Sequence, residues 1–110
     1  MTLSTHVLDA SAGRPAANVP LTLHRRAGGS WEQIGRDATD DDGRCTTLAP
    51  DGLHEAVYRL VFDTATYFSA SGQTGFHPEV SVVFHITDPD RHHHVPLLLS
   101  PFAYSTYLGS

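Results

Sequence analysis

The stretch HHHVPLLLSPFAYSTYLGS, residues 92–110, holds the pattern that decides the fold. Proline has no N–H for a strand ladder and restricts the residue before it, so Ser100-Pro101 divides the stretch into two strands. Residues two apart in a strand share a face. Along the first strand, one face is an apolar stripe that we expect in the core: Val95, Leu97 and Leu99. The opposite face carries His94, Pro96 and Leu98.

The second strand of this stretch carries Ser105 and Tyr107 on one face. This strand comes next along the chain, and we expect it to lie beside the face that carries His94. A sheet face that mixes apolar side chains with histidine, serine and tyrosine is neither ordinary core nor ordinary solvent surface. This composition predicts a site or an interface.

The rest of the chain alternates short strands with turns. Alternation and apolar residues indicate strands at residues 5–10, 19–25, 31–36, 53–62 and 80–86, with a further strand starting at Arg44. Asp63 can cap a short helix that runs to about Ala70 and stops at Gly72. The pattern predicts one all-β domain, residues 1–110: a two-sheet antiparallel sandwich of about eight strands with one short helix.

Composition limits the function classes. Hydrophobic residues make up 40% of the 110 residues, enough for a core, and the net charge of -5 argues against nucleic acid as a partner. Cys45 is the only cysteine, which excludes an internal disulfide and fits a reducing compartment. No signal peptide is visible, and no apolar run reaches the roughly 18 residues of a membrane span. We therefore expect a soluble, cytoplasmic protein without a membrane partner.

Three groups of motifs carry a family resemblance. They are HVPLLLSP (94–101) with YSTY (104–107) and Gly109-Ser110, then LSTHVLD (3–9) with GRPA (13–16), and finally DGR (42–44). In this order they resemble the transthyretin family over the whole chain, and more narrowly its 5-hydroxyisourate hydrolase branch. The resemblance implies the transthyretin (prealbumin-like) sandwich, with the helix after the fifth strand.

The same resemblance implies the site. It makes His6, Arg44 and His94 the catalytic residues, and it makes Pro96, Leu98, Tyr107 and Ser110 the residues that bind substrate. Arg44 matches an arginine that faces the substrate in the hydrolases, where the hormone-carrier branch has an acidic residue. The carrier branch also lacks histidine at the positions of His6 and His94. One departure stands out: the enzyme branch ends Tyr-Arg-Gly-Ser, and here Leu108 replaces the arginine.

The triple histidine is open to a metal interpretation, which the spacing disfavours. Strand alternation places His92 and His94 on one face and His93 on the other, whereas zinc needs three or four ligands. We expect no metal and no cofactor, a functional His94, and His92 and His93 at the surface or supporting the site. The remaining strand and loop histidines are interpreted as structural: His24, His54, His77 and His85.

By resemblance, the expected reaction belongs to purine (urate) degradation. 5-Hydroxyisourate is the small-molecule substrate, and water opens its ring to give 2-oxo-4-hydroxy-4-carboxy-5-ureidoimidazoline. One histidine of the pair His6 and His94 fits the general base, without a choice between them, and Arg44 fits electrostatic stabilisation. The alternatives are a transthyretin-like small-ligand binding protein without hydrolase activity and an interaction module without a small-molecule site.

We also expect a homotetramer, a dimer of dimers with its sites at the dimer-dimer interface. The face that carries Leu8, Pro96, Leu98 and Tyr107 is too apolar for a small monomer to leave in water. Packing two such faces across a twofold axis buries them and arranges His6 and His94 of each copy around a shared channel.

Overall fold

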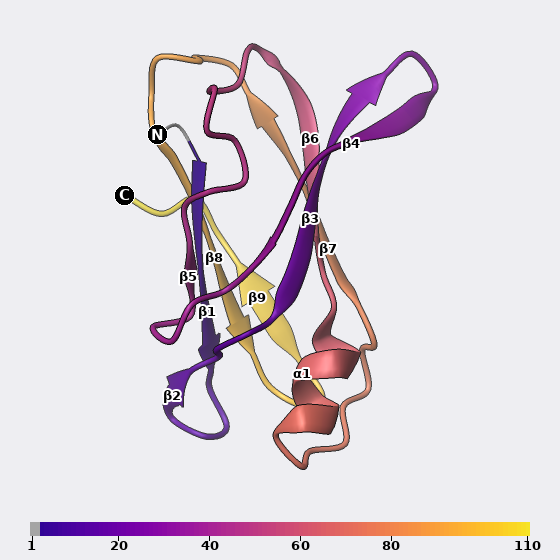
Figure 1. Ribbon diagram of the computed structural model, residues 1–110, viewed down its shortest axis with the longest axis vertical. Helices are drawn as coiled ribbons and strands as arrows, with labels where there is room; N and C mark the ends of the chain where they lie inside the picture. The colour runs from indigo at the N-terminus through magenta and orange to yellow at the C-terminus, as the bar shows by residue number, and fades with distance from the viewer. Residues whose placement is uncertain (1–2) are drawn as a thin grey trace.

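Two β-sheets packed face to face form the body of the molecule in the computed structural model, which describes residues 3–110 (Figure 1). The first sheet contains β1 (Leu3–Asp9), β2 (Arg14–Pro15), β5 (Arg44–Cys45), β8 (His93–Leu99) and β9 (Tyr104–Thr106). The second contains β3 (Pro20–Ala27), β4 (Ser30–Ala38), β6 (Ala56–Phe62) and β7 (Val80–Ile86). Helix α1 (Thr64–Ala70) follows β6 at one end of the sandwich.

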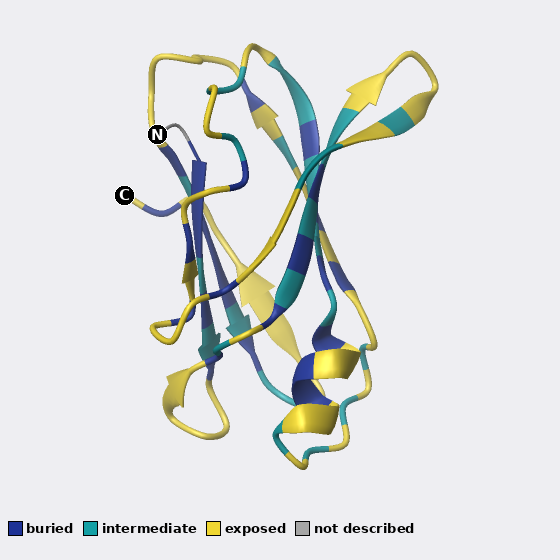
Figure 2. Ribbon diagram, viewed as in Figure 1, coloured by how far each residue is buried: buried dark blue, intermediate teal, exposed yellow. Residues whose placement is uncertain are grey.

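The core lies between the sheets, where the alternation along each strand places the apolar side chains. Val95, Leu97 and Leu99 of β8 are buried, which confirms the core stripe expected from the sequence. Tyr58, Leu60 and Phe62 of β6 face them from the other sheet and are fully buried. Figure 2 shows the resulting pattern, with buried segments along β1, β3, β6 and β8 and exposed segments in most loops and on β9.

The fold class predicted from the sequence is confirmed, with two refinements. The sandwich has nine strands among the described residues, because the two-residue strand β2 pairs with β1 in addition to β5, the strand expected at Arg44. The pair β1–β8 is parallel, whereas every other pair is antiparallel. A parallel pair needs a long connection, and most of the chain separates these two strands. The antiparallel pairing expected from the sequence holds for every pair of strands except this central one.

Helix α1 forms as its capping residue predicts. The Asp63 carboxylate accepts a hydrogen bond from the backbone N–H of Thr66, which satisfies one of the free N–H groups of the first turn. Gly72 follows the helix with a φ of 72°, the left-handed conformation that favours glycine. Tyr67 and Phe68 are buried and fix the helix to the end of the sandwich.

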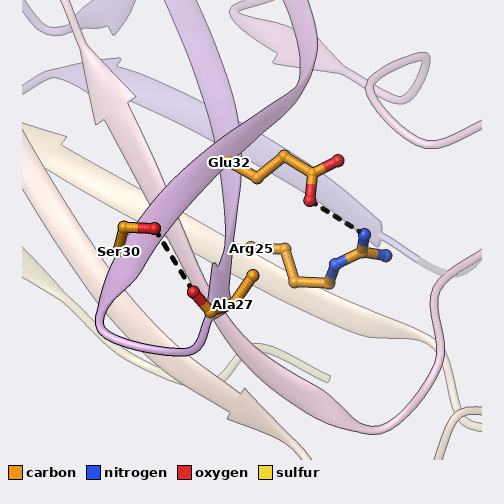
Figure 3. Close-up of polar contacts among 4 residues, drawn as sticks. All are labelled: Arg25, Ala27, Ser30 and Glu32. Carbon is orange, nitrogen blue, oxygen red and sulfur yellow. Dashed lines mark hydrogen bonds and ion pairs between the residues drawn. The ribbon is translucent and has the colours of Figure 1, made fainter.

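The hairpin of β3 and β4 extends away from the first sheet (Figure 1). The Ser30 hydroxyl donates to the carbonyl of Ala27 at 3.3 Å, and Arg25 pairs with Glu32 at 3.3 Å (Figure 3). These contacts stiffen a projecting ribbon and lie outside the histidine-bearing face. Within residues 3–110, no helix has the length and apolar character that a bilayer crossing requires.

Candidate active site

The outer face of the first sheet carries the histidines in rows that the strand register defines. In one row, Arg44 of β5, His6 of β1 and Pro96 of β8 are directly adjacent. Paired residues of neighbouring strands project to the same side of a sheet. The register therefore brings together three residues that lie far apart in the sequence.

A second row lies beside the first. Ser4 of β1 pairs with His94 of β8, and His94 bridges to Gly109 near the C-terminal end. His94 and His6 are thus diagonal neighbours on one face, at a spacing that long side chains can span. The C-terminal segment lies along the edge of β8 opposite β1, which is why this row has three members.

A third row is apolar. Leu8 pairs with Leu98, and Leu98 pairs with Ser105 of β9. Leu8 and Leu98 are half-buried and Pro96 is buried within a single chain, so this face exposes less apolar area than the sequence indicated. The rows together form a surface with a charged and histidine-bearing end and an apolar end.

Arg44 is positioned by the turn that precedes it. The Asp40 carboxylate accepts hydrogen bonds from the backbone N–H groups of Asp42 and Arg44, both at 2.9 Å. Gly43 lies between them with a φ of 75°, and a Cβ there would come within 2.4 Å of the Val7 carbonyl oxygen. Only glycine satisfies both conditions. The turn holds the exposed Arg44 beside His6.

His6 has a defined tautomer. Its Nε2 lies 2.9 Å from the carbonyl oxygen of Asp42, and a carbonyl only accepts. Nε2 therefore carries a hydrogen and donates it, which leaves Nδ1 of the neutral ring as an acceptor. The turn that orients Arg44 thus also orients His6.

His94 is held from β1. Its Nδ1 lies 2.8 Å from the Ser4 hydroxyl, which also lies 2.8 Å from Nε2 of His92. Burial lowers the pKa of His94 below the usual 6.5, and electrostatic interaction with His6, Arg44 and His92 lowers it further, against a smaller opposing contribution from a backbone hydrogen bond at Ser4. His94 is therefore neutral near pH 7, the form in which a histidine accepts a proton.

The residues after β9 approach this face in part. The Gly109 N–H donates to the His94 carbonyl at 2.8 Å, which brings the exposed Ser110 next to the histidine row. Tyr107 and Leu108 are exposed and line a cleft of about 320 Å³ with β7 residues such as Val83. Of the predicted substrate-binding residues, Pro96, Leu98 and Ser110 lie at the histidine face, whereas Tyr107 borders the cleft.

The sequence reasoning missed one contact at the site and left the place of one histidine open. Ser4 contacts both His92 and His94, and its only sequence signal was its position two residues before His6, on the same face of the strand. His93 was expected at the surface or supporting the site, but it is buried and its Nδ1 lies 2.9 Å from the Arg91 carbonyl. Alternation explains the difference, because His93 points inward from β8.

The other histidines lie elsewhere. His24 and His85 belong to the second sheet, the backbone carbonyl of His54 accepts from the Tyr58 hydroxyl, and His77 contacts Tyr104 edge to face. Across residues 3–110, no group of three or more histidine, cysteine or acidic side chains is arranged to hold a metal ion.

The inner face of β1 carries a second polar cluster. The buried Asp9 carboxylate accepts hydrogen bonds from the Tyr67 hydroxyl at 2.6 Å, the Gln73 amide at 3.0 Å, and the Ser11 hydroxyl and Ala12 N–H at 2.9 Å. Burial alone raises the pKa of Asp9, but the four hydrogen bonds outweigh it and lower the pKa to about 2. This cluster ties β1 to the helix.

Two sheets in these orders, one helix after β6, and a histidine and arginine face on the first sheet define a transthyretin-like β-sandwich protein. The family model described as HIUase/Transthyretin matches residues 3–109, and the chain belongs to that family.

Individual relatives agree with this assignment. The chain is 44% identical to 5-hydroxyisourate hydrolase of Mus musculus, over 98% of this chain and 94% of that protein. Its fold matches the 5-hydroxyisourate hydrolase of Klebsiella pneumoniae with a TM-score of 0.88 at 35% identity, covering 100% of both chains. It also matches sea bream transthyretin in complex with thyroxine, with a TM-score of 0.93 at 37% identity, covering 99% of this chain and 95% of that one. An (S)-allantoin synthase matches with a TM-score of 0.89 at 34% identity, and the chain, 99% covered, spans 43% of that protein.

Proposed function

We propose that this chain is a 5-hydroxyisourate hydrolase of purine (urate) degradation. It opens the ring of 5-hydroxyisourate with water to give 2-oxo-4-hydroxy-4-carboxy-5-ureidoimidazoline. The observation that carries the proposal is the convergence of His6, Arg44 and His94 on one sheet face. The chain also resembles proteins that bear this name at 44% identity over 98% of its length.

The reaction needs a base, an anion stabiliser and a proton donor. His94, neutral because its pKa is lowered, accepts a proton from water as the oxygen attacks the carbonyl carbon. Arg44 stabilises the oxyanion that develops on the carbonyl oxygen, and its planar fork stays charged. The C–N bond then breaks, and the leaving nitrogen takes a proton from a protonated ring of the histidine pair.

The remaining residues of the face shape the binding surface. Pro96 lies next to His6 and Leu98 lies next to Leu8, which gives an apolar floor beside the histidines. Ser110 follows Gly109 and offers its hydroxyl at the edge of the His94 row. Tyr107, in the cleft beside β7, contributes through the segment that delivers Gly109 and Ser110.

The assembly in this proposal is a homotetramer, a dimer of dimers with sites where two histidine faces meet. Tyr107 and Leu108, which expose more than half of their surface, and the half-buried Leu8 and Leu98 gain cover in such an interface. Light scattering at micromolar concentration should give four times the mass of 11.9 kDa. A stable monomer would overturn both the assembly and the shared site.

The compartment in this proposal is the cytoplasm. Cys45 is buried and unpaired, as is usual for a protein kept in a reducing environment. Fractionation of cells that express the tagged chain, with a cytoplasmic and a secreted marker, tests this placement. Recovery with the secreted marker would contradict it.

The direct test is identification of the product. Freshly generated 5-hydroxyisourate is mixed with the purified protein, and the products are followed by ¹³C NMR beside a sample without protein. The proposal expects 2-oxo-4-hydroxy-4-carboxy-5-ureidoimidazoline to form well ahead of spontaneous decay. Equal rates in both samples would reject the hydrolase.

The second candidate is a small-ligand binding protein without hydrolase activity. Its supporting observations are Leu108, at the position of the enzyme branch's arginine, and the TM-score of 0.93 to the thyroxine complex of sea bream transthyretin. Calorimetric titration with thyroxine separates the two functions. Tight binding together with no turnover would place the binding function first.

A further inference from the structure

One polar contact at the histidine face has no part in the mechanism proposed above. Ser4 is only 8% exposed, and its hydroxyl lies between two rings, 2.8 Å from Nδ1 of His94 and 2.8 Å from Nε2 of His92. The three residues come from opposite ends of the sequence and meet because β1 and β8 pair in parallel, with Ser4 opposite His94.

The hydroxyl has a single hydrogen, and this restricts the rings. Ser4 donates to one ring at most, so at least one of the two rings must present an N–H to its oxygen. If His94 donates from Nδ1, Ser4 is free to donate to His92, and Nε2 of neutral His94 keeps its lone pair. If Ser4 instead donates to Nδ1 of His94, the neutral ring carries its hydrogen on Nε2 and has no basic nitrogen left.

We propose that Ser4 is a positioning residue that fixes the tautomer of His94, accepting its Nδ1–H while donating its own hydrogen to Nε2 of His92. This inference rests on the proposed function, because a general base at His94 requires a lone pair on Nε2. His92, which the mechanism leaves aside, becomes the acceptor that orients the Ser4 hydroxyl.

The arrangement also supports the charge that develops during the reaction. When Nε2 of His94 takes the water proton, the ring becomes a cation whose Nδ1–H already donates to Ser4. No proton has to leave Ser4 or His92 at that moment, since a hydroxyl oxygen accepts from the neutral ring and the cation alike. The hydrogen bond strengthens as the charge develops on the ring, so it lowers the barrier rather than only binding substrate.

The C-terminal segment holds the opposite edge of the ring. A Cβ placed on Gly109 would lie 2.5 Å from Cδ2 of His94, so the backbone of Gly109 packs directly on that edge. Nδ1 and Cδ2 are both bonded to Cγ of the ring. Ser4 contacts the Nδ1 edge and Gly109 packs on the Cδ2 edge, so the ring is held on both sides. A ring held in this way cannot flip, which would exchange Nδ1 with Cδ2, without losing the Ser4 contact or displacing Gly109.

The first experiment measures the tautomer without any turnover. The full chain is labelled with ¹⁵N-histidine, and two-bond ¹H–¹⁵N correlations are recorded above the pKa of His94, whose signals are assigned by their loss in His94→Gln. We expect His94 as the Nδ1–H tautomer in the unmodified protein and a shift toward Nε2–H in Ser4→Ala. His92→Ala, at an exposed position, should shift it the same way, because the Ser4 hydroxyl can then donate to His94. An Nε2–H tautomer in the unmodified protein, or no shift in either variant, overturns the proposal.

The second experiment is kinetic and has a matched control. Ser4→Ala should lower kcat roughly 10- to 100-fold with little change in KM, less than the roughly 10²- to 10⁴-fold that a general base supplies. Ser4→Thr keeps the hydroxyl and should restore most of kcat, whereas Ser81→Ala on the exposed face of β7 should match the unmodified protein. A Ser4→Ala enzyme with unchanged kcat overturns the role of Ser4. Absence of turnover in the unmodified protein would instead reject the proposed function, and the tautomer measurement would still decide the contact.

Discussion

Strand β1 carries polar side chains on both faces, and the fold treats the two sets differently. On the inner face, Asp9 accepts four hydrogen bonds from its own chain and is 1% exposed. On the outer face, among residues 3–110, one ring nitrogen of His6 has no hydrogen-bond partner and the exposed Arg44 guanidinium makes no ion pair. Polar groups that are fully satisfied internally stabilise a fold, whereas groups with unused capacity are available to a ligand. We therefore assign stability to the inner cluster and chemistry to the outer face.

Substitutions on the outer face should have the largest effect, and the quantity that they lower should be kcat. His94→Ala or Arg44→Ala removes the proposed base or oxyanion stabiliser, so kcat should fall by roughly 10²-fold or more. The free energy of unfolding should change by less than about 1 kcal/mol for the exposed Arg44. Steady-state kinetics and urea unfolding measure both quantities, with His54→Ala, at an exposed position outside the site, as the control. Unchanged kcat in both site variants would contradict the assignment of the chemistry to the outer face.

Substitution on the inner face should reverse this pattern. Asp9→Ala leaves the buried Tyr67 hydroxyl without its acceptor, so the free energy of unfolding should fall by about 2–3 kcal/mol. The value of kcat per folded molecule should stay within about twofold, because the substitution leaves the residues on the outer face of the sheet in place. Urea unfolding of this variant beside Asp51→Ala, in an exposed turn, gives the comparison. A loss of kcat as large as that of His94→Ala would show that the two faces are coupled.

The contribution of the inner polar cluster to the free energy of unfolding should depend on pH in the acid range. The pKa of Asp9 is lowered from 3.8 to about 2 in the folded chain, so the unfolded chain binds the proton more readily. Its contribution is fully present above pH 4 and is lost as the pH falls from about 4 to 2, an effect of about 2 kcal/mol. The measurement is urea unfolding across this range, and Asp9→Asn should remove this part of the pH dependence.

The pH dependence of kcat/KM should reflect the titration of His94 on the outer face, at a higher pH than the titration of Asp9. The pKa of His94 is lowered below 6.5 by burial and by electrostatic interaction with His6, the Arg44 guanidinium and His92. The basic form persists as the pH falls to 6.5, so the acid limb of kcat/KM should lie below that value. Arg44→Gln removes the guanidinium charge and should move the limb to higher pH in the residual activity. A limb that stays fixed in this variant would argue against His94 as the titrating base.

The smallest effect should come from the edge of the outer face. Leu108 is exposed and has no part in the proposed chemistry, so we expect the charge added by Leu108→Arg to bind ground state and transition state alike. We expect KM to fall about 3- to 10-fold with kcat unchanged, which corresponds to roughly 1 kcal/mol. Turnover that appears only in Leu108→Arg would make the unmodified chain a binding protein.

The sequence was sufficient for the strands whose side chains alternate. The stripe Val95, Leu97 and Leu99 lies in the core as predicted, and α1 begins after its Asp63 cap. The parallel direction of β1 and β8 was not predictable from alternation, because alternation assigns faces within a strand and gives no information about its neighbour. Such pairing depends on contacts between the two ends of the chain.

The candidate site was predictable only in part for the same reason. His6, Arg44 and His94 were named from motifs, and the register brings them to one face. In the sequence alone, Ser4 is an ordinary strand serine and Asp9 is a carboxylate at the end of a strand. Their roles follow from the contact of Ser4 with His94 of β8 and the contact of Asp9 with Tyr67. Contacts between residues that are distant in the sequence decide both roles.

The central claim is that the outer face of β1 and β8 hydrolyses 5-hydroxyisourate through His94. The most direct measurement is the initial rate of loss of freshly made 5-hydroxyisourate at equal folded concentrations of the unmodified protein and His94→Ala, with the spontaneous rate subtracted. The account predicts rapid loss with the unmodified protein and a rate lower by roughly 10²-fold or more with His94→Ala. Equal rates for the two proteins would contradict it.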